Sequence, residues 1–470
     1  MMNCSAHLPR VLTFLVLACA APLPAGAAEP LLAGIATIDI TPPVGYRMSG
    51  YFNERFSTGV KDPLQAKALV LRQGDVAAAL VFCDLIGVPR RVADRARADA
   101  AQATGIPAEH IAVAATHSHT GPLYYEVLRN HFHARAIEQH GADPHEPFDY
   151  AAELATQLTT VISQAASAAA PVELAAGFAR EERLSFNRRF HMKDGSVQFN
   201  PGLKNPNIVR AAGPIDPQVG VIALRRPEAV APTAALAAFA LHLDTLGGTE
   251  YSADYPRVVE DELRKSFGAD FQFLFGAGTC GDLNHIDVAA TTVRKTPEIG
   301  AMLAETIGDA MTGNGLDRIA EPRLGAKSTK VSAALQRYSR DEVAAARAKL
   351  PLIGGRELPF LDQVKACAIC AVDDYHADAL PLDVQAFRLS DDAAIVTLPA
   401  EVFVEIGLAI KARSPFKTTL VFELTNDCLG YIPTRKAFAE GSYETVNSRI
   451  EPGAGEQLVD AALSLLRDLK

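Results

Sequence analysis

Short apolar runs rich in β-branched residues alternate along this chain with longer amphipathic stretches rich in alanine. Such alternation is typical of strands and helices that pack in layers, and it predicts an α/β domain. Two apolar runs, Lys67–Arg72 and Val76–Phe82, flank a turn at Gly74 and predict a β-hairpin. Further strands are expected at 111–115, 219–224, 236–241, 271–275, 384–389, 394–398 and 418–424, and helices at 92–104, 147–168, 255–266, 298–311, 341–349, 402–412 and 456–469.

Neither an internal repeat nor a Pro/Ser-rich linker divides the chain. With 49% hydrophobic and 21% charged residues, a chain of this length can bury a substantial core. We therefore expect one large catalytic domain over residues 29–470, with a mixed β-sheet core flanked by helices. No additional β-rich domain is expected at its carboxyl end.

Four of the predicted strands run directly into side chains that can bind a metal. In chain order, these strands are followed by His117 and His119, by His242 and Asp244, by Glu401, and by Tyr431. Ligands and catalytic groups gather beyond the carboxyl ends of strands in α/β sheets, because a rigid strand fixes the loop that follows it. The repeated arrangement predicts that these side chains converge.

Each of these residues also has a plainer interpretation when it is considered alone. His117 and His119 are spaced i, i+2, which on an extended segment places both on one side, as two metal ligands or as a ligand and a hydrogen-bond donor. They could equally be a structural pair. His242 could be a core histidine, Glu401 a residue favoured by a helix N-terminus, and Tyr431 a packing aromatic.

Other familiar catalytic patterns are absent from the sequence. The glycine-rich segment Gly276–Asp282 lacks the Lys-Ser/Thr of a phosphate-binding loop, and no Gly-x-Ser-x-Gly elbow occurs. Four histidines fall in a polar segment that we expect to be a solvated, loop-like lid, with a second metal site as the alternative: His131, His133, His140 and His145.

The first residues have the order of a secretory signal peptide. A short basic start is followed by the apolar run Val11–Ala18 and by small residues up to Ala28, where cleavage is expected. A lipoprotein processing site that leaves Cys19 lipidated is the alternative interpretation. Both predict export, to the periplasm or the exterior.

Charge, hydropathy and cysteine content limit the binding partners, the membrane topology and the disulfides that the chain can have. The net charge of −10 and the lack of a Lys/Arg cluster argue against binding nucleic acid, and no later apolar stretch is long enough to cross a membrane. Five cysteines remain after residue 28, too few for a disulfide scaffold. Cys367 and Cys370 are predicted to form a local disulfide, with a redox pair or half of a zinc knuckle as alternatives.

Taken together, these motifs resemble the catalytic region of the neutral/alkaline non-lysosomal ceramidases. The most specific match is Ala115–Pro122 (ATHSHTGP), which is similar to the family's THTHSGP segment. In the same order follow Phe239–His242, Leu398–Phe403, Gly430–Thr434 and Gly441–Glu444, and the opening Gly34–Pro43 is also similar. The resemblance extends over nearly all of residues 29–470.

The resemblance implies a zinc amidase that cleaves N-acylsphingosines, a lipid substrate that would bring the enzyme into peripheral contact with membranes. It implies that Zn²⁺ is held by His117, His242, Glu401 and Tyr431. His119 and Tyr443 would donate hydrogen bonds to the reacting amide, and Arg188 would orient a polar group of the substrate. Asp244 and Asp282 are expected to hold a ligand imidazole in place.

One segment departs from the family pattern and affects the choice of substrate. After Gly281-Asp282 the family has a residue followed by Ser-Pro-Asn, whereas this chain has Leu283-Asn284-His285. The family's serine lies near the substrate headgroup. This departure leaves open a zinc hydrolase of the same fold that acts on another amide or an ester. A non-catalytic scaffold that has kept the fold is a separate alternative.

Overall fold

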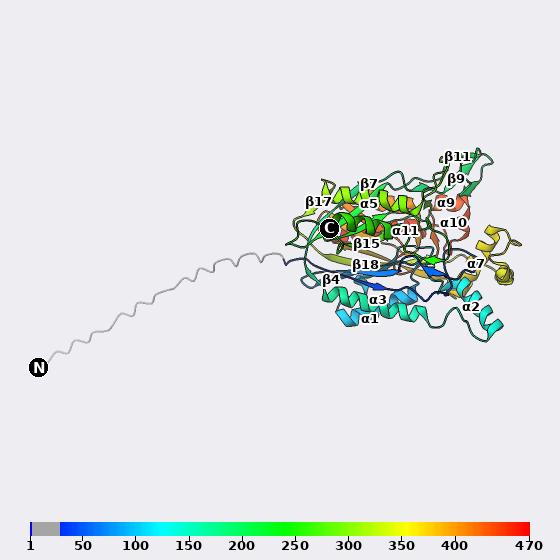
Figure 1. Cartoon of the computed structure of the whole chain (residues 1–470), viewed down its shortest axis with the longest axis horizontal. Coiled ribbons are helices and arrows are strands. Elements are labelled where there is room, and N and C mark those ends of the chain that lie inside the picture. Colours follow the sequence, from blue (N-terminus) through cyan, green and yellow to red (C-terminus); the bar gives the residue numbers. More distant parts are fainter. Residues whose placement is uncertain (2–28) are drawn as a thin grey trace.

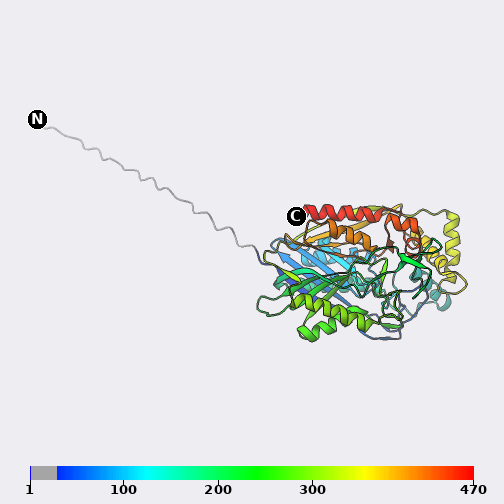
Figure 2. The same cartoon turned by 90° about the horizontal axis from the view of Figure 1, so that it is seen from above.

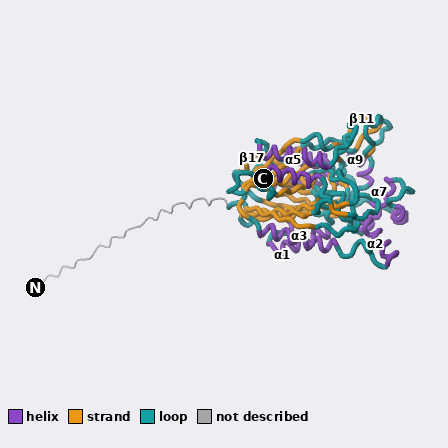
Figure 3. Tube along the Cα trace, in the orientation of Figure 1, coloured by secondary structure: helices purple, strands orange, loops and turns teal. Residues whose placement is uncertain are grey.

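A computed structural model describes Met1 and residues 29–470. The predicted signal peptide and Cys19 lie outside the described residues. Three β-sheets form the centre of the molecule and helices cover them on the outside (Figure 1). Loops gather at the end of the strands that lies away from residue 29, as the teal segments in Figure 3 show.

The first sheet has the strand order β5-β4-β3-β1-β6. Its strands are β1 (Leu32–Asp39), β3 (Gln65–Gln73), β4 (Val76–Cys83), β5 (Ile111–Ala115) and β6 (Ala170–Pro171). They pair antiparallel except for β4 and β5, which are parallel. One face packs against the helices α1 (Arg90–Thr104) and α3 (Tyr150–Ser167), burying small and branched side chains between them.

The second sheet has the order β15-β13-β12-β7-β17. These strands are β7 (Glu173–Arg180), β12 (Gln218–Arg225), β13 (Ala234–Phe239), β15 (Gln272–Ala277) and β17 (Leu316–Ile319). Here β13 and β15 form the parallel pair. Its outer face is covered by α4 (Tyr255–Phe267) and α5 (Thr296–Thr312).

The third sheet, β18-β19-β20-β22, also ends in a parallel pair, β20 and β22. Its strands are β18 (Gly325–Ala334), β19 (Ala379–Arg388), β20 (Ala393–Thr397) and β22 (Thr418–Phe422). The helices α8 (Val404–Arg413) and α11 (Ala454–Leu469) pack on its outer face. In Figure 2, α11 in red and the green helices α4 and α5 lie on opposite sides of the strands.

Shorter elements connect and cap these layers. Small strands are β2 (Gly59–Val60), β8 (Phe186–Asn187), β9 (Arg189–Met192), β10 (Val197–Phe199), β11 (Ile208–Ala211), β14 (Glu250–Tyr251), β16 (Leu283–Asn284), β21 (Glu401–Val402) and β23 (Tyr431–Ile432). The remaining helices are α2 (Glu126–His140), α6 (Arg340–Lys349), α7 (Phe360–Asp374), α9 (Arg435–Glu440) and α10 (Tyr443–Val446), with 3₁₀ turns at Ala108–His110 and Leu350–Leu352.

A central core joins the inner faces of the three sheets. Phe82 of the first sheet and Phe422 of the third meet with ring centroids 5.1 Å apart. Gly276 of the second sheet faces both rings, and a Cβ atom added there would lie 2.3 Å from Phe422 and 2.5 Å from Phe82. The absence of a side chain at Gly276 therefore lets the three sheets approach one another.

The mixed α/β fold and all of the strands and helices expected from the sequence are present in the structure. The hairpin of β3 and β4, for example, pairs Gln73 with Val76 across the turn at Gly74. Two expectations are wrong. The polar segment with four histidines is mostly the helix α2, and Cys367 and Cys370 are buried, unbonded thiols of α7 packed toward α2 and α6.

No helix of the described residues is both long and apolar enough to cross a membrane.

The close packing of β1 on α3 gives a stability prediction. A Cβ atom on Gly34 would lie 1.9 Å from the Ala165 carbonyl oxygen at the end of α3. We expect Gly34→Ala to lower the free energy of unfolding by about 1–3 kcal/mol, because strand and helix must separate. Chemical denaturation of the wild type and the variant would measure this difference in the free energy of unfolding.

The matched control for this substitution is Gly308→Ala, within α5. An added Cβ there meets only ordinary van der Waals contact with Leu263, at 3.9 Å. Because alanine favours a helix over glycine, this variant should be as stable as the wild type or up to about 1 kcal/mol more stable. Equal stability of the two variants would contradict the packing described here.

Candidate metal centre

Four side chains reach one point from four separate segments of the chain. His117 follows β5, His242 follows β13, and Glu401 and Tyr431 open β21 and β23. These two short strands pair in parallel with Glu401 directly opposite Tyr431, so both side chains project to the same side. The convergence predicted from the carboxyl ends of strands is present in the structure.

The potential ligand atoms lie close together. Nε2 of His117 is 2.9 Å from Nε2 of His242 and 3.3 Å from Oε2 of Glu401, and His242 Nε2 is 3.7 Å from the same oxygen. The Tyr431 hydroxyl also contacts the Glu401 carboxylate. His117, His242 and Tyr431 are almost completely buried.

Backbone strain marks the segments that carry these side chains. His117 has a φ of 83°, Ala400 before Glu401 has 64°, and Ser442 before Tyr443 has 86°. Non-glycine residues rarely adopt this left-handed region, and such residues concentrate at functional sites. The spacing of His117 and His119 suggested an extended segment, but the positive φ of His117 shows that its backbone is not extended. The two imidazoles nevertheless meet, with their Nε2 atoms 3.3 Å apart.

Backbone carbonyls fix the tautomers of both His117 and His242. His117 Nδ1 donates to the Ile86 carbonyl at 2.8 Å, and His242 Nδ1 lies 3.4 Å from the Cys280 carbonyl. Because a carbonyl only accepts, each Nδ1 carries the proton and each Nε2 presents a lone pair in the neutral ring. With both rings neutral, two lone pairs would face the Glu401 carboxylate; without a cation, this carboxylate favours the protonated form of His117 instead.

This arrangement of donors fits a divalent cation. Oε2 of Glu401 is buried and has no hydrogen-bond partner, which is costly for a carboxylate oxygen unless a positive charge is close. Two imidazoles, a carboxylate and a phenol are ligands that zinc accepts, at bond lengths of about 2.0–2.2 Å. Ligand atoms in such a tetrahedron are about 3.3–3.6 Å apart, in the middle of the range observed here.

The electrostatics of the ligands are coupled. Burial lowers the pKa of His117, but the Glu401 carboxylate more than reverses this and raises it. Burial and the neighbouring charges of His117 and Arg188 depress the pKa of His242 well below its usual value. Burial alone would raise the pKa of Glu401, but the positive charge of His117 has the larger effect and lowers it. The Glu401 carboxyl group therefore stays ionised.

A second buried carboxyl group supports the segment that carries Glu401. Glu423 accepts the Val402 backbone N–H at 2.7 Å with Oε2 and the Cys280 thiol at 3.0 Å with Oε1. Burial raises the pKa of Glu423 to about 8. Glu423 thus connects Val402, which follows Glu401, to Cys280, whose carbonyl contacts His242. No sequence pattern indicated this role of Glu423.

His119 and Tyr443, the expected hydrogen-bond donors, border the same point. Burial and the charge of His117 lower the pKa of His119 to about 4, so its imidazole is neutral at pH 7 and keeps one N–H. Burial raises the pKa of Tyr443 to about 12, so the phenol keeps its proton. The Tyr443 ring stands edge-on to Tyr431, with centroids 5.5 Å apart.

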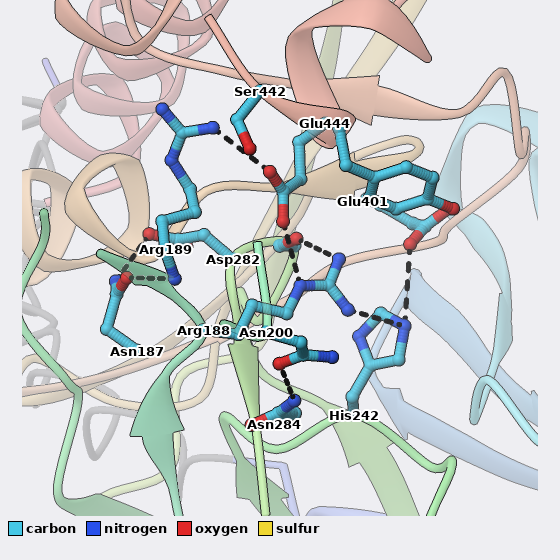
Figure 4. A network of polar contacts seen from close by, with 12 residues as sticks. Asn187, Arg188, Arg189, Asn200, His242, Asp282, Asn284, Glu401, Ser442 and Glu444 are labelled. Carbon is cyan, nitrogen blue, oxygen red and sulfur yellow. Dashed lines mark hydrogen bonds and ion pairs between the residues drawn. The ribbon is translucent and has the colours of Figure 1, made fainter. Parts of the chain in front are cut away.

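Arg188 belongs to a buried polar network next to His242 (Figure 4). Its Nε donates to Glu444 at 3.0 Å and its Nη2 to the Gly281 carbonyl at 2.7 Å, while Nη1 lies 3.5 Å from His242 Nε2. The guanidinium is thus occupied by protein groups. This position favours holding the residues of the centre in place over orienting a substrate group.

The two expected supporting aspartates differ in what they contact. Asp282 accepts the Asn187 amide and the Val404 backbone N–H, both at 2.8 Å, and so anchors the start of α8. The expectation that it holds a ligand imidazole is wrong, because the Cys280 carbonyl takes that place at His242. Asp244 pairs with His285 at 3.3 Å, and its charge acts on the neighbouring His119.

A cavity of about 150 Å³ opens beside the centre. His117, His119, Glu401, Tyr431 and Tyr443 form one wall. The other walls are mainly apolar, but they include residues that the sequence did not single out: Glu126, Asn447 and Arg449. An apolar cavity with a few convergent polar groups is the usual form of a small-molecule site.

The second group of potential metal ligands has a different character. His133 Nδ1 lies 2.7 Å from Asp143 and 3.3 Å from Glu146. Two arginines neutralise these carboxylates: Arg47 contacts both, and Arg129 lies 2.6 Å from Glu146. The cluster is an ion-pair network that ties the loop of Arg47 to the segment after α2, and it does not support a second metal site.

The fold and this centre define a class: mixed α/β proteins whose strands end in a buried cluster of three imidazoles, from His117, His119 and His242, with a carboxylate and a phenol beside them. Neither the protein-family models nor the curated proteins contain a match to the chain. Among solved structures, the neutral ceramidase of Pseudomonas aeruginosa matches with a TM-score of 0.70 and 18% identity, over 94% of this chain and 75% of that one.

A structure described as a ceramidase complexed with C2 matches with a TM-score of 0.68 and 18% identity, over 94% of this chain and 76% of that one. The chain therefore has a ceramidase-like fold. At this level of identity the comparison establishes the fold alone, and the chemistry has to be argued from the residues of the site.

Proposed function

We propose that this protein is an exported, zinc-dependent amide hydrolase that cleaves the N-acyl bond of ceramide or a related N-acylated lipid. The observation that carries the proposal is the convergence of His117, His242, Glu401 and Tyr431 on one buried point at the wall of a cavity. The ceramidase-like fold supports the same conclusion. We assign these four residues as zinc ligands.

Zinc bound by these residues would polarise the amide carbonyl and lower the pKa of bound water towards about 7. His119 keeps an N–H and Tyr443 an O–H at neutral pH, so both can donate to the oxygen on which negative charge develops or to the departing amine. The Ile86 and Cys280 carbonyls hold the imidazoles of His117 and His242 in the tautomer that binds a cation.

The surroundings of the cavity are consistent with an acyl chain. Apolar side chains line it away from the centre, among them Ile86, Leu123, Val127, Leu128 and Leu424. Tyr51 packs beside His119 and Phe360 stacks on Tyr443, with ring centroids 5.9 Å and 5.6 Å apart, and the two side chains remain 41% and 47% exposed. We propose that the acyl chain leaves the cavity over these rings, which would also allow contact with a lipid surface.

Activity should depend on the metal and on the class of substrate. We expect the purified protein to hydrolyse N-acylsphingosines in preference to N-acyl amino acids and short esters. A chelator should abolish turnover and added Zn²⁺ should restore it. The circular dichroism spectrum should not change, because the large core does not need the metal to fold.

The same assay separates the alternatives. Preferred hydrolysis of N-acyl amino acids or esters would indicate a zinc hydrolase of this fold with another substrate. Absence of turnover on all three classes by the zinc-loaded protein would contradict a catalytic role and favour a scaffold. Turnover that survives complete removal of the metal would contradict zinc dependence.

A further inference from the structure

The cavity wall continues from Tyr443 into two residues that are buried next to the centre. Asn447 and Arg449 are 8% and 6% exposed, and both line the cavity. Asn447 Nδ2 donates to the Tyr443 hydroxyl at 3.2 Å. Arg449 Nη1 donates to Asn447 Oδ1 at 2.7 Å and also contacts the Asn447 backbone carbonyl.

Arg449 determines which way the Asn447 side-chain amide points. An arginine has only donors, so the amide must turn its oxygen to the guanidinium and its NH₂ group to the phenol. Arg449 itself is held from two sides. Its Nη2 lies 3.4 Å from Glu126, and its Nη1 packs on Gly430, where an added Cβ would lie only 2.3 Å away.

This chain of donors has a consequence for Tyr443. Since Asn447 donates to the phenol oxygen, the phenol's own proton cannot point to Asn447 and has to point elsewhere. The hydroxyl lies at the cavity wall between Asn447 and Tyr431. Its proton is therefore directed towards the cavity and the metal-binding residues, where a substrate oxygen or nitrogen would accept it.

We infer that Asn447, with its amide oriented by Arg449, is a positioning residue that directs the Tyr443 proton to the reacting amide. The inference rests on the proposed hydrolase function and adds to it a role for two residues outside the set of ligands and donors. Asn447 does not touch the substrate in this account. It acts only through Tyr443.

Asn447→Asp is the sharpest test, because it changes one NH₂ group to an oxygen and keeps the shape. The carboxylate still accepts from Arg449, but it can no longer donate to Tyr443 and instead draws the phenol's proton towards itself. We expect kcat for the amide substrate to fall about 10- to 100-fold with little change in KM. The melting temperature should not fall, because Arg449 gains an ionic partner.

A double-mutant cycle identifies the route of the effect. In a Tyr443→Phe background, Asn447→Asp should cause no further loss of kcat, because the group through which it acts is gone. The matched control is Asn207→Asp, at an exposed position that is distant from Asn447 in the sequence. This variant should leave kcat and KM unchanged. If the aspartate variant does not fold, Asn447→Ala should show a smaller loss with the same non-additivity.

The outcomes distinguish this inference from the function on which it rests. Full kcat in Asn447→Asp would overturn the positioning role while the hydrolase stands. So would an equal loss of kcat when Asn447→Asp is introduced into the wild type and into the Tyr443→Phe variant. A wild-type protein that is inactive on every amide would overturn the proposed function and this role with it.

Discussion

Replacing His117 by alanine should lower amide hydrolysis at least about a thousandfold while leaving the fold largely intact. His117 contributes the nitrogen that lies nearest to both His242 Nε2 and Glu401 Oε2. Without it the remaining donors leave the cation incompletely held. Steady-state kinetics, with zinc content and circular dichroism on the same preparation, would measure the effect.

The control is His140→Ala, which removes an exposed imidazole at the end of α2. That variant should keep the activity and zinc content of the wild type. Substantial turnover in His117→Ala would exclude His117 as a metal ligand. A loss of helical signal in that variant would show that the imidazole is needed for folding instead.

Tyr443→Phe should lower kcat about 100- to 1,000-fold with a nearly unchanged KM. The substitution removes one hydroxyl at the cavity wall and keeps the ring that packs on Tyr431 and Phe360. A donor that acts mainly on charge developing in the transition state affects kcat more than substrate binding. Initial rates over a range of amide concentrations would separate the two parameters.

Tyr338→Phe is the appropriate comparison for this variant. It also removes a partly buried hydroxyl that makes a hydrogen bond, to Gln336 at 2.8 Å, but it lies outside the cavity wall. Its kinetics should match the wild type. If Tyr443→Phe raised KM and left kcat unchanged, the phenol would bind the substrate and not stabilise the transition state.

Much of the fold and of the centre could be predicted from the sequence, for reasons that the structure makes clear. Buried strands such as β5 and β13 are continuous apolar runs, and a histidine of the centre follows each of them within three residues. The period of apolar residues and the position of a side chain after a strand are local properties of the chain. They survive in the sequence even when identity to known structures is low.

Features that depend on contacts across the chain could not be predicted in the same way. Glu423 and Cys280 are 143 positions apart and meet only because β15 and β22 both end at the centre. The helix α2 looks like a polar loop in the sequence because His133 is paired with Asp143 beyond the end of the helix, and Asp143 is in turn neutralised by Arg47 from a distant loop. The spacing of Tyr443 and Asn447, i and i+4, could have indicated their contact.

Zinc content, measured in the wild type and in single alanine variants, tests the central claim most directly. If His117, His242 and Glu401 share one cation, the wild type should contain about one zinc ion per chain and His117→Ala, His242→Ala and Glu401→Ala should each lose it while staying folded. A wild type that binds no zinc, or folded variants that keep it in full, would contradict the account.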